Sequence, residues 1–166
     1  LPNYVSHMFK KTADGQGLAA LCYGPASVVA DVAGVRVRIE EATRYPFEER
    51  VEFRFQPDQP VTFEFLARVP TWSPTVDVAC EGATIRRQGD YVCARKEWKA
   101  GDVLSVGFVA PVEAIRWVNG EYALKSGPLI FAADLGATPT RYDTFPSGHT
   151  IQEMSDGQLP IYGLSP

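Results

Sequence analysis

Hydrophobic and polar residues alternate over several short segments of the chain. This two-residue period is typical of β-strands that bury one face. The clearest example is residues 35–40, VRVRIE, in which valine and isoleucine alternate with charged residues. Residues 51–55 and 61–69 repeat the pattern, and the QPDQP sequence between them predicts a turn. We therefore predict a hairpin of these two segments. Six apolar positions of alternating segments are predicted to be buried: Phe53, Phe63, Phe65, Val78, Val106 and Phe108.

Turn-forming residues recur between these segments and set the predicted fold class. The chain has 13 Pro and 14 Gly, and Pro70 and Pro74 bracket one interruption of the strand pattern. Turn signals about every 8 to 12 residues indicate an all-β fold, a β-sandwich of about ten short antiparallel strands. We expect the sandwich to span residues 15–135. Residues 136–166 show no sustained period, and we expect an extended tail there.

The first 11 residues, LPNYVSHMFKK, have a different period. Leu1, Val5, Met8 and Phe9 are spaced as on one face of a helix, and the DGQG that follows would end that helix. No capping residue precedes the pattern. We therefore expect residues 1–14 to be the remnant of a preceding helical region.

Composition and charge narrow the functional classes. The net charge is −4 and 22% of residues are charged, so a nucleic-acid partner is not expected. No stretch of about 18 apolar residues is present, so no membrane-spanning helix is expected either.

Three cysteines are the first candidates for chemistry. Cys22, Cys80 and Cys93 form an odd set without a CxxC motif. Cys80 and Cys93 lie in strand-like segments, which favours buried thiols. A disulfide between Cys80 and Cys93 and a metal-binding or nucleophilic role are the alternatives.

Carboxylates are the second candidates, because a glycosidase needs two of them on either side of a sugar. Glu40 and Glu41 are adjacent, as are Glu48 and Glu49. Adjacent residues of a strand point to opposite faces, so neither pair could flank one bond. We expect these side chains to be solvated, and the sequence predicts neither a catalytic residue nor a metal site.

Aromatic residues could instead stack on a sugar ring. A sandwich core also needs large rings, and core packing is the favoured interpretation. Trp98 precedes a Gly-Asp turn and is expected to cover the end of a hairpin. The candidates for carbohydrate binding are Tyr45, Phe47, Trp72, Trp98 and Trp117.

Five segments follow one another within roughly residues 15–134: GLAALCYGPASV, RIEEATRYPFEERVEFRF, FEFLARVPTW, GDYVCARKEWKAGDVLSVGF and ALKSGPLIFAAD. Their order resembles the C-terminal β-sandwich region of glycoside hydrolase family 127, the bacterial β-L-arabinofuranosidases. The resemblance implies an accessory sandwich domain behind an N-terminal (α/α)6 barrel that carries the active site. In that family a cysteine nucleophile is held in a zinc cluster of Cys and Glu ligands on the barrel.

The resemblance transfers no catalytic residue to this chain, because the family's adjacent cysteine pair is not present in it. It implies that the missing barrel of the same polypeptide is the partner and that zinc belongs to that barrel. A surface shaped to meet the barrel would favour self-association of the chain alone. A carbohydrate-binding module for plant oligosaccharides is the alternative function.

Overall fold

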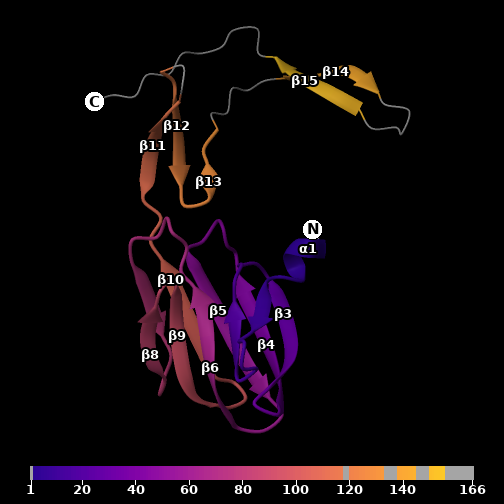
Figure 1. Cartoon of the computed structure of the whole chain (residues 1–166). Coiled ribbons are helices and arrows are strands. Elements are labelled where there is room, and N and C mark those ends of the chain that lie inside the picture. The colour runs from indigo at the N-terminus through magenta and orange to yellow at the C-terminus, as the bar shows by residue number, and fades with distance from the viewer. Residues whose placement is uncertain (1, 118–119, 133–137, 145–149, 156–166) are drawn as a thin grey trace. The chain divides into compact units, whose positions relative to one another are not determined.

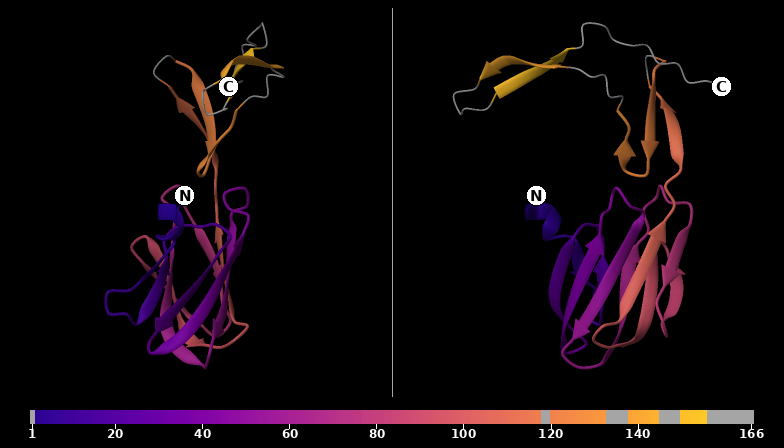
Figure 2. Two further views of the ribbon diagram at one scale, coloured as in Figure 1. Left: turned by 90° about the vertical axis from the view of Figure 1, so that its right-hand side faces the viewer. Right: turned by 180° about the vertical axis from the view of Figure 1, so that it is seen from behind.

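The computed structural model describes residues 2–117, 120–132, 138–144 and 150–155, and apart from one short helix their regular secondary structure is β-strand (Figure 1). The chain divides into two compact units, Leu1–Ile130 and Phe131–Pro166. In the first unit two five-stranded sheets lie face to face, as the two views of Figure 2 show. The predicted all-β sandwich is confirmed. No helix within the described residues is long and apolar enough to cross a membrane.

Each sheet of the sandwich combines strands that are consecutive in the chain with strands that are distant in sequence. The first sheet has the order β1 (Phe9–Lys11), β2 (Gly17–Ala20), β6 (Val61–Arg68), β9 (Tyr91–Trp98), β8 (Thr84–Gln88). The second sheet has the order β3 (Ala26–Val32), β4 (Val35–Thr43), β5 (Arg50–Pro57), β10 (Val103–Phe108), β7 (Val76–Ala79). Neighbouring strands are antiparallel except for β2 and β6, which are parallel.

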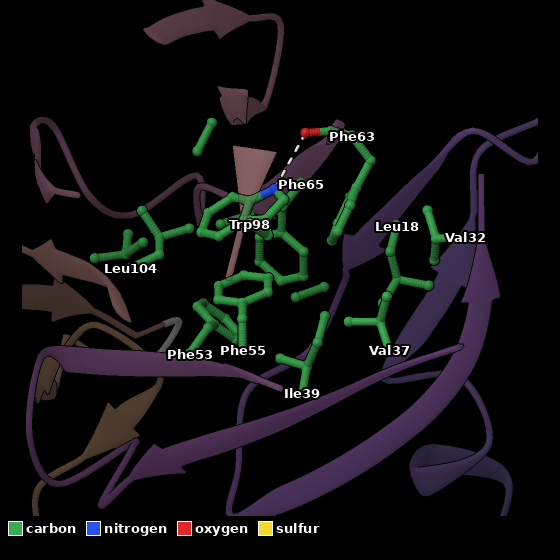
Figure 3. Packing of buried hydrophobic residues seen from close by; sticks show 14 of the residues in the cluster. Leu18, Val32, Val37, Ile39, Phe53, Phe55, Phe63, Phe65, Trp98 and Leu104 are labelled. Carbon is green, nitrogen blue, oxygen red and sulfur yellow. Dashed lines mark hydrogen bonds between the residues drawn. The ribbon is translucent and has the colours of Figure 1, made fainter. Parts of the chain in front are cut away.

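The core between the sheets follows from the alternation in the sequence (Figure 3). The Trp98 ring stacks on Phe55 with 3.8 Å between ring centroids, and its indole N–H donates a 3.1 Å hydrogen bond to the Phe63 carbonyl. A buried Trp with a satisfied N–H adds a large apolar area without an unpaired donor. The prediction that Trp98 covers the end of a hairpin is therefore wrong. Its ring lies inside the core.

The predicted hairpin of residues 51–55 and 61–69 is wrong. The two segments become β5 and β6, which belong to opposite sheets, so the QPDQP loop crosses the sandwich. Phe55 and Phe65 meet across the core with ring centroids 5.2 Å apart. Alternation specifies which side chains are buried, but two strands with inward-facing rings can pack face to face as well as pair edge to edge.

Five of the predicted core positions are buried: Phe53, Phe63, Phe65, Val106 and Phe108. Val78 is only partly buried, although it packs against the core. Its strand, β7, is the edge strand of the second sheet, which leaves one side open.

The N-terminal helix is much shorter than predicted. Helix α1 spans only Pro2–Val5, and Phe9 already belongs to β1, where it pairs with Ala20 of β2. Met8 is 3% exposed and Phe9 packs against the core. A short isolated helix is marginally stable, and the burial of Met8 together with the packing of Phe9 against the core outweighs the helical spacing.

The C-terminal part contains one strand pair that was not predicted, in addition to a small sheet. Strands β11 (Val112–Arg116), β12 (Tyr122–Ser126) and β13 (Leu129–Ile130) form a small antiparallel sheet in the first unit. The second unit contains an antiparallel pair, β14 (Thr138–Thr144) and β15 (Thr150–Ser155), where an extended tail was expected. These two segments lack apolar alternation, so no sequence pattern predicted the pairing.

Candidate functional site: an aromatic pocket at one end of the sandwich

The loops that follow β2, β4 and β6 meet at one end of the sandwich and enclose a pocket of about 250 Å³. Its walls include four aromatic rings, from Tyr4, Tyr23, Tyr45 and Trp72. Arg68, the last residue of β6, lies on its rim. Aromatic walls with a cation beside them can bind an apolar or ring-shaped group.

Tyr23 is the centre of this arrangement. Its side chain is 5% exposed, and its hydroxyl donates a hydrogen bond to the Arg68 carbonyl, which joins the loop after β2 to the end of β6. The ring lies edge-on to Tyr45, with centroids 5.7 Å apart, and 5.3 Å from Phe108. The Tyr4 hydroxyl donates a 2.9 Å hydrogen bond to the Tyr23 carbonyl. Burial raises the pKa of Tyr23 well above its usual value, so its hydroxyl remains protonated.

Tyr45 and Trp72 form the second part of the pocket. Their rings are stacked, 6.4 Å apart and inclined by 19°, and both are half-buried. Trp72 also meets Phe108 edge-on at 5.8 Å. The turn between β12 and β13 approaches Trp72 so closely that a Cβ added at Gly127 would lie 3.4 Å from the indole ring. Tyr45, Phe108 and Gly127 thus already cover much of the Trp72 ring.

Glu41 in β4 is a buried carboxylate at the same end of the core. It is 1% exposed, and its Oε1 accepts a 2.9 Å hydrogen bond from the Gly24 amide. Within the described residues its Oε2 has no hydrogen-bond partner. Burial raises the pKa of Glu41 from 4.5 to about 8, against the lowering effect of the Gly24 hydrogen bond. Glu41 is therefore largely protonated in the folded chain at neutral pH.

The expectation of a solvated Glu40–Glu41 pair is half wrong. The two side chains do point to opposite faces, and Glu40 is exposed, but Glu41 continues the buried row of Val37 and Ile39. The alternation itself contained this signal, because position 41 is in phase with the apolar residues of β4.

The structure separates the five aromatic residues predicted as candidates for carbohydrate binding. Phe47, in the loop between β4 and β5, is 75% exposed. Tyr45 and Trp72 come together at the pocket. Trp98 is 0% exposed, so its ring is not available to stack on a sugar. Trp117, which follows β11, is 61% exposed in the small sheet.

The three cysteines are free thiols, so the alternative of a Cys80–Cys93 disulfide is wrong. Cys80 follows β7 of the second sheet, whereas Cys93 lies in β9 of the first. Cys93 faces outward, yet it is 0% exposed, because Arg86 and Glu64 on the strands either side of β9 form an ion pair of 2.8 Å across it. Burial raises the pKa of both Cys80 and Cys93, which makes them poor nucleophiles.

The His, Cys, Asp and Glu side chains that the structure describes do not form a zinc cluster. Among the residues that the structure describes, no three His, Cys, Asp or Glu side chains gather closely enough to hold a metal ion. No step of catalysis can be derived through a metal on these residues.

The fold and the pocket define a β-sandwich domain with an aromatic-lined end. The sequence model of the middle domain of β-L-arabinofuranosidases of glycoside hydrolase family 127 (GH127) matches residues 17–109, more than half of the chain. The chain therefore belongs to family GH127, and the resemblance is confirmed. The matching segment is the family's middle domain, and it begins with β2 and ends one residue after β10.

Solved structures share the fold at low sequence identity. A GH127 β-L-arabinofuranosidase from Geobacillus stearothermophilus T6 is 24% identical, with a TM-score of 0.66 over 75% of this chain and 21% of its own. A protein described as a glycoside hydrolase is 18% identical, with a TM-score of 0.59 over 91% of this chain and 31% of its own. A GH127 β-arabinofuranosidase is 13% identical, with a TM-score of 0.62 over 86% of this chain and 31% of its own.

The chain thus spans less than a third of each of these solved chains. No curated protein sequence matches it significantly.

Proposed function

We propose that this chain is a non-catalytic accessory domain of a GH127 glycosidase and that it stabilises the enzyme's catalytic (α/α)6 barrel. One observation carries the proposal: the matched middle domain, residues 17–109, coincides with the strands β2 to β10 that build the sandwich. The part of the chain that most resembles the family is thus a packed core. A packed core is suited to support a neighbouring domain.

The parent enzyme is proposed to hydrolyse β-L-arabinofuranosides or related plant glycans. The names of two similar solved proteins, a β-L-arabinofuranosidase and a β-arabinofuranosidase, support this substrate class. The zinc and the cysteine nucleophile implied by the family resemblance are assigned to the barrel. The raised thiol pKa values of Cys80 and Cys93 are consistent with that assignment.

The division of labour can be tested with an aryl β-L-arabinofuranoside. We expect the complete polypeptide to release the aryl group and the 166-residue chain alone to release none, with or without added zinc. The measurement is the rate of aryl release at equal protein concentrations. Release by the chain alone that is lost on replacing Cys22, Cys80 or Cys93 by alanine would refute the non-catalytic role.

Carbohydrate binding is a second candidate function, favoured by one observation. The Trp117 side chain is 61% exposed, and an exposed indole can stack on a sugar ring. Titration of the chain with arabino-oligosaccharides, followed by Trp fluorescence in wild type and Trp117→Ala, would detect such binding.

A further inference from the structure

We infer that the pocket end of the sandwich is the surface on which the catalytic barrel of the same polypeptide docks. The docking surface is defined by Tyr4, Tyr45, Phe47, Arg68 and Trp72. The pocket would receive one large apolar side chain of the barrel. The inference rests on the proposed function and adds to it the place of contact.

Exposed apolar side chains mark this end of the sandwich. Phe47, in the loop between β4 and β5, is 75% exposed, and Tyr4 is 46% exposed. Val109, one residue after β10, is 49% exposed. Such side chains gathered at one end indicate a contact with another protein surface.

The opposite end of the sandwich has a different composition. Its loops at residues 33–34, 58–60 and 99–102 read AG, DQP and KAGD, and they contain no large apolar side chain. These residues are typical of solvent-exposed turns. Val103, at the start of β10, is 40% exposed at this end, less than Phe47, Tyr4 or Val109 at the pocket end. The two ends therefore differ in the way expected if only one of them is covered.

The pocket suits a side chain better than an oligosaccharide. Its volume of about 250 Å³ is below the roughly 300 to 1,000 Å³ of sites that hold drug-sized ligands. The stacked Tyr45–Trp72 pair and the edge-on Phe108 and Gly127 leave little of the indole face free for a sugar ring. An inserted apolar side chain would contact ring edges instead, a frequent arrangement at protein interfaces.

The chain itself approaches the sandwich at this end. Residues 2–8 precede the matched middle domain, and they lie against the loop after β2. The Tyr4 hydroxyl binds the Tyr23 carbonyl, and the Leu21 amide donates a 2.8 Å hydrogen bond to the Met8 carbonyl. In the proposed polypeptide the barrel precedes the sandwich, so the connection between them runs beside the pocket.

Hydrogen–deuterium exchange tests the assignment in the complete polypeptide. Amides of residues 44–48 and 71–75, apart from Pro46 and Pro74, which have no amide hydrogen, should exchange at least about tenfold more slowly in the complete polypeptide than in the chain alone. Amides of residues 58–59 and 99–102, at the opposite end, should exchange equally in both.

The alternative outcomes are distinct. Protection confined to another surface, such as the small sheet at residues 112–130, would overturn the assigned surface and leave the proposed function intact. Slowed exchange nowhere in the sandwich would overturn both. If residues 44–48 of the chain alone become more protected as its concentration rises, the occupant is a second copy. If added arabino-oligosaccharide protects them, the occupant is a sugar. Either result would overturn the inference.

Two matched variants give a second readout. Phe47→Ser and Val103→Ser each remove an exposed apolar side chain, at the pocket end and the opposite end respectively. In the complete polypeptide, Phe47→Ser should raise the exchange rate of residues 71–75 at least halfway, on a logarithmic scale, toward the rate in the chain alone. Val103→Ser should leave that rate unchanged. Equal effects of the two variants would contradict the inference.

Discussion

Replacing Glu41 by glutamine should stabilise the sandwich increasingly as the pH rises from 4 to 8. The folded chain raises the pKa of Glu41 from 4.5 to about 8, so the folded state binds its proton more tightly than the unfolded state does. The wild-type chain therefore loses stability as the pH rises from about 4.5 to about 8, and the loss is complete above that range. Glutamine does not titrate, and its Oε1 can still accept the Gly24 hydrogen bond.

The size of this effect follows from about 1.4 kcal/mol for each unit of pKa shift. The difference in free energy of unfolding between Glu41→Gln and wild type should grow by about 3 to 5 kcal/mol between pH 4 and pH 8. Urea titrations at both pH values measure it. Glu40→Gln, on the exposed face of the same strand, is the control. The difference in free energy of unfolding between Glu40→Gln and wild type should change by less than about 0.5 kcal/mol between pH 4 and pH 8. A pH-independent difference for Glu41→Gln would show that this carboxyl is not kept protonated by burial.

Truncating Phe65 should cause the second large effect. This side chain is 0% exposed, and its ring centroid lies 4.8 Å from that of Phe53 and 5.2 Å from that of Phe55. Phe65→Ala removes contacts with both sheets and leaves a cavity, so it should lower the free energy of unfolding by about 3 to 5 kcal/mol.

Urea titration at fixed pH measures this loss. Phe47→Ala, which truncates a ring that is 75% exposed, should cost less than about 0.5 kcal/mol in the chain alone. A loss under about 1 kcal/mol for Phe65→Ala would mean that the core is not packed around this ring.

The fold class and most of the core could be predicted from the sequence because alternation is a local signal. Val35, Val37 and Ile39 reveal the buried face of β4 without knowledge of any other strand. The partner of each strand is not a local property. Phe53 and Phe65 were correctly predicted to be buried, but only the tertiary packing decides that they meet across the core and not within one sheet.

Competing local signals explain the other differences. Met8 and Phe9 fit a helical stripe, yet Met8 is buried and Phe9 begins β1, where it pairs with β2 and packs partly buried against the core. The aromatic candidates were found by residue type alone. Which of them meet depended on the loops after β4 and β6, which bring Tyr45 and Trp72 together, and on the burial of Trp98 in the core.

The most direct test of the central claim, that the sandwich stabilises the catalytic barrel, is the thermal inactivation of the complete polypeptide with Phe65→Ala in its sandwich. Hydrolysis of an aryl β-L-arabinofuranoside is measured after incubation at increasing temperatures. The account predicts equal turnover by both proteins at low temperature and an inactivation midpoint that is lower by roughly 10 °C in the variant, in step with the unfolding of the sandwich. The claim would be contradicted if both proteins lost activity at the same temperature although the variant sandwich unfolded earlier.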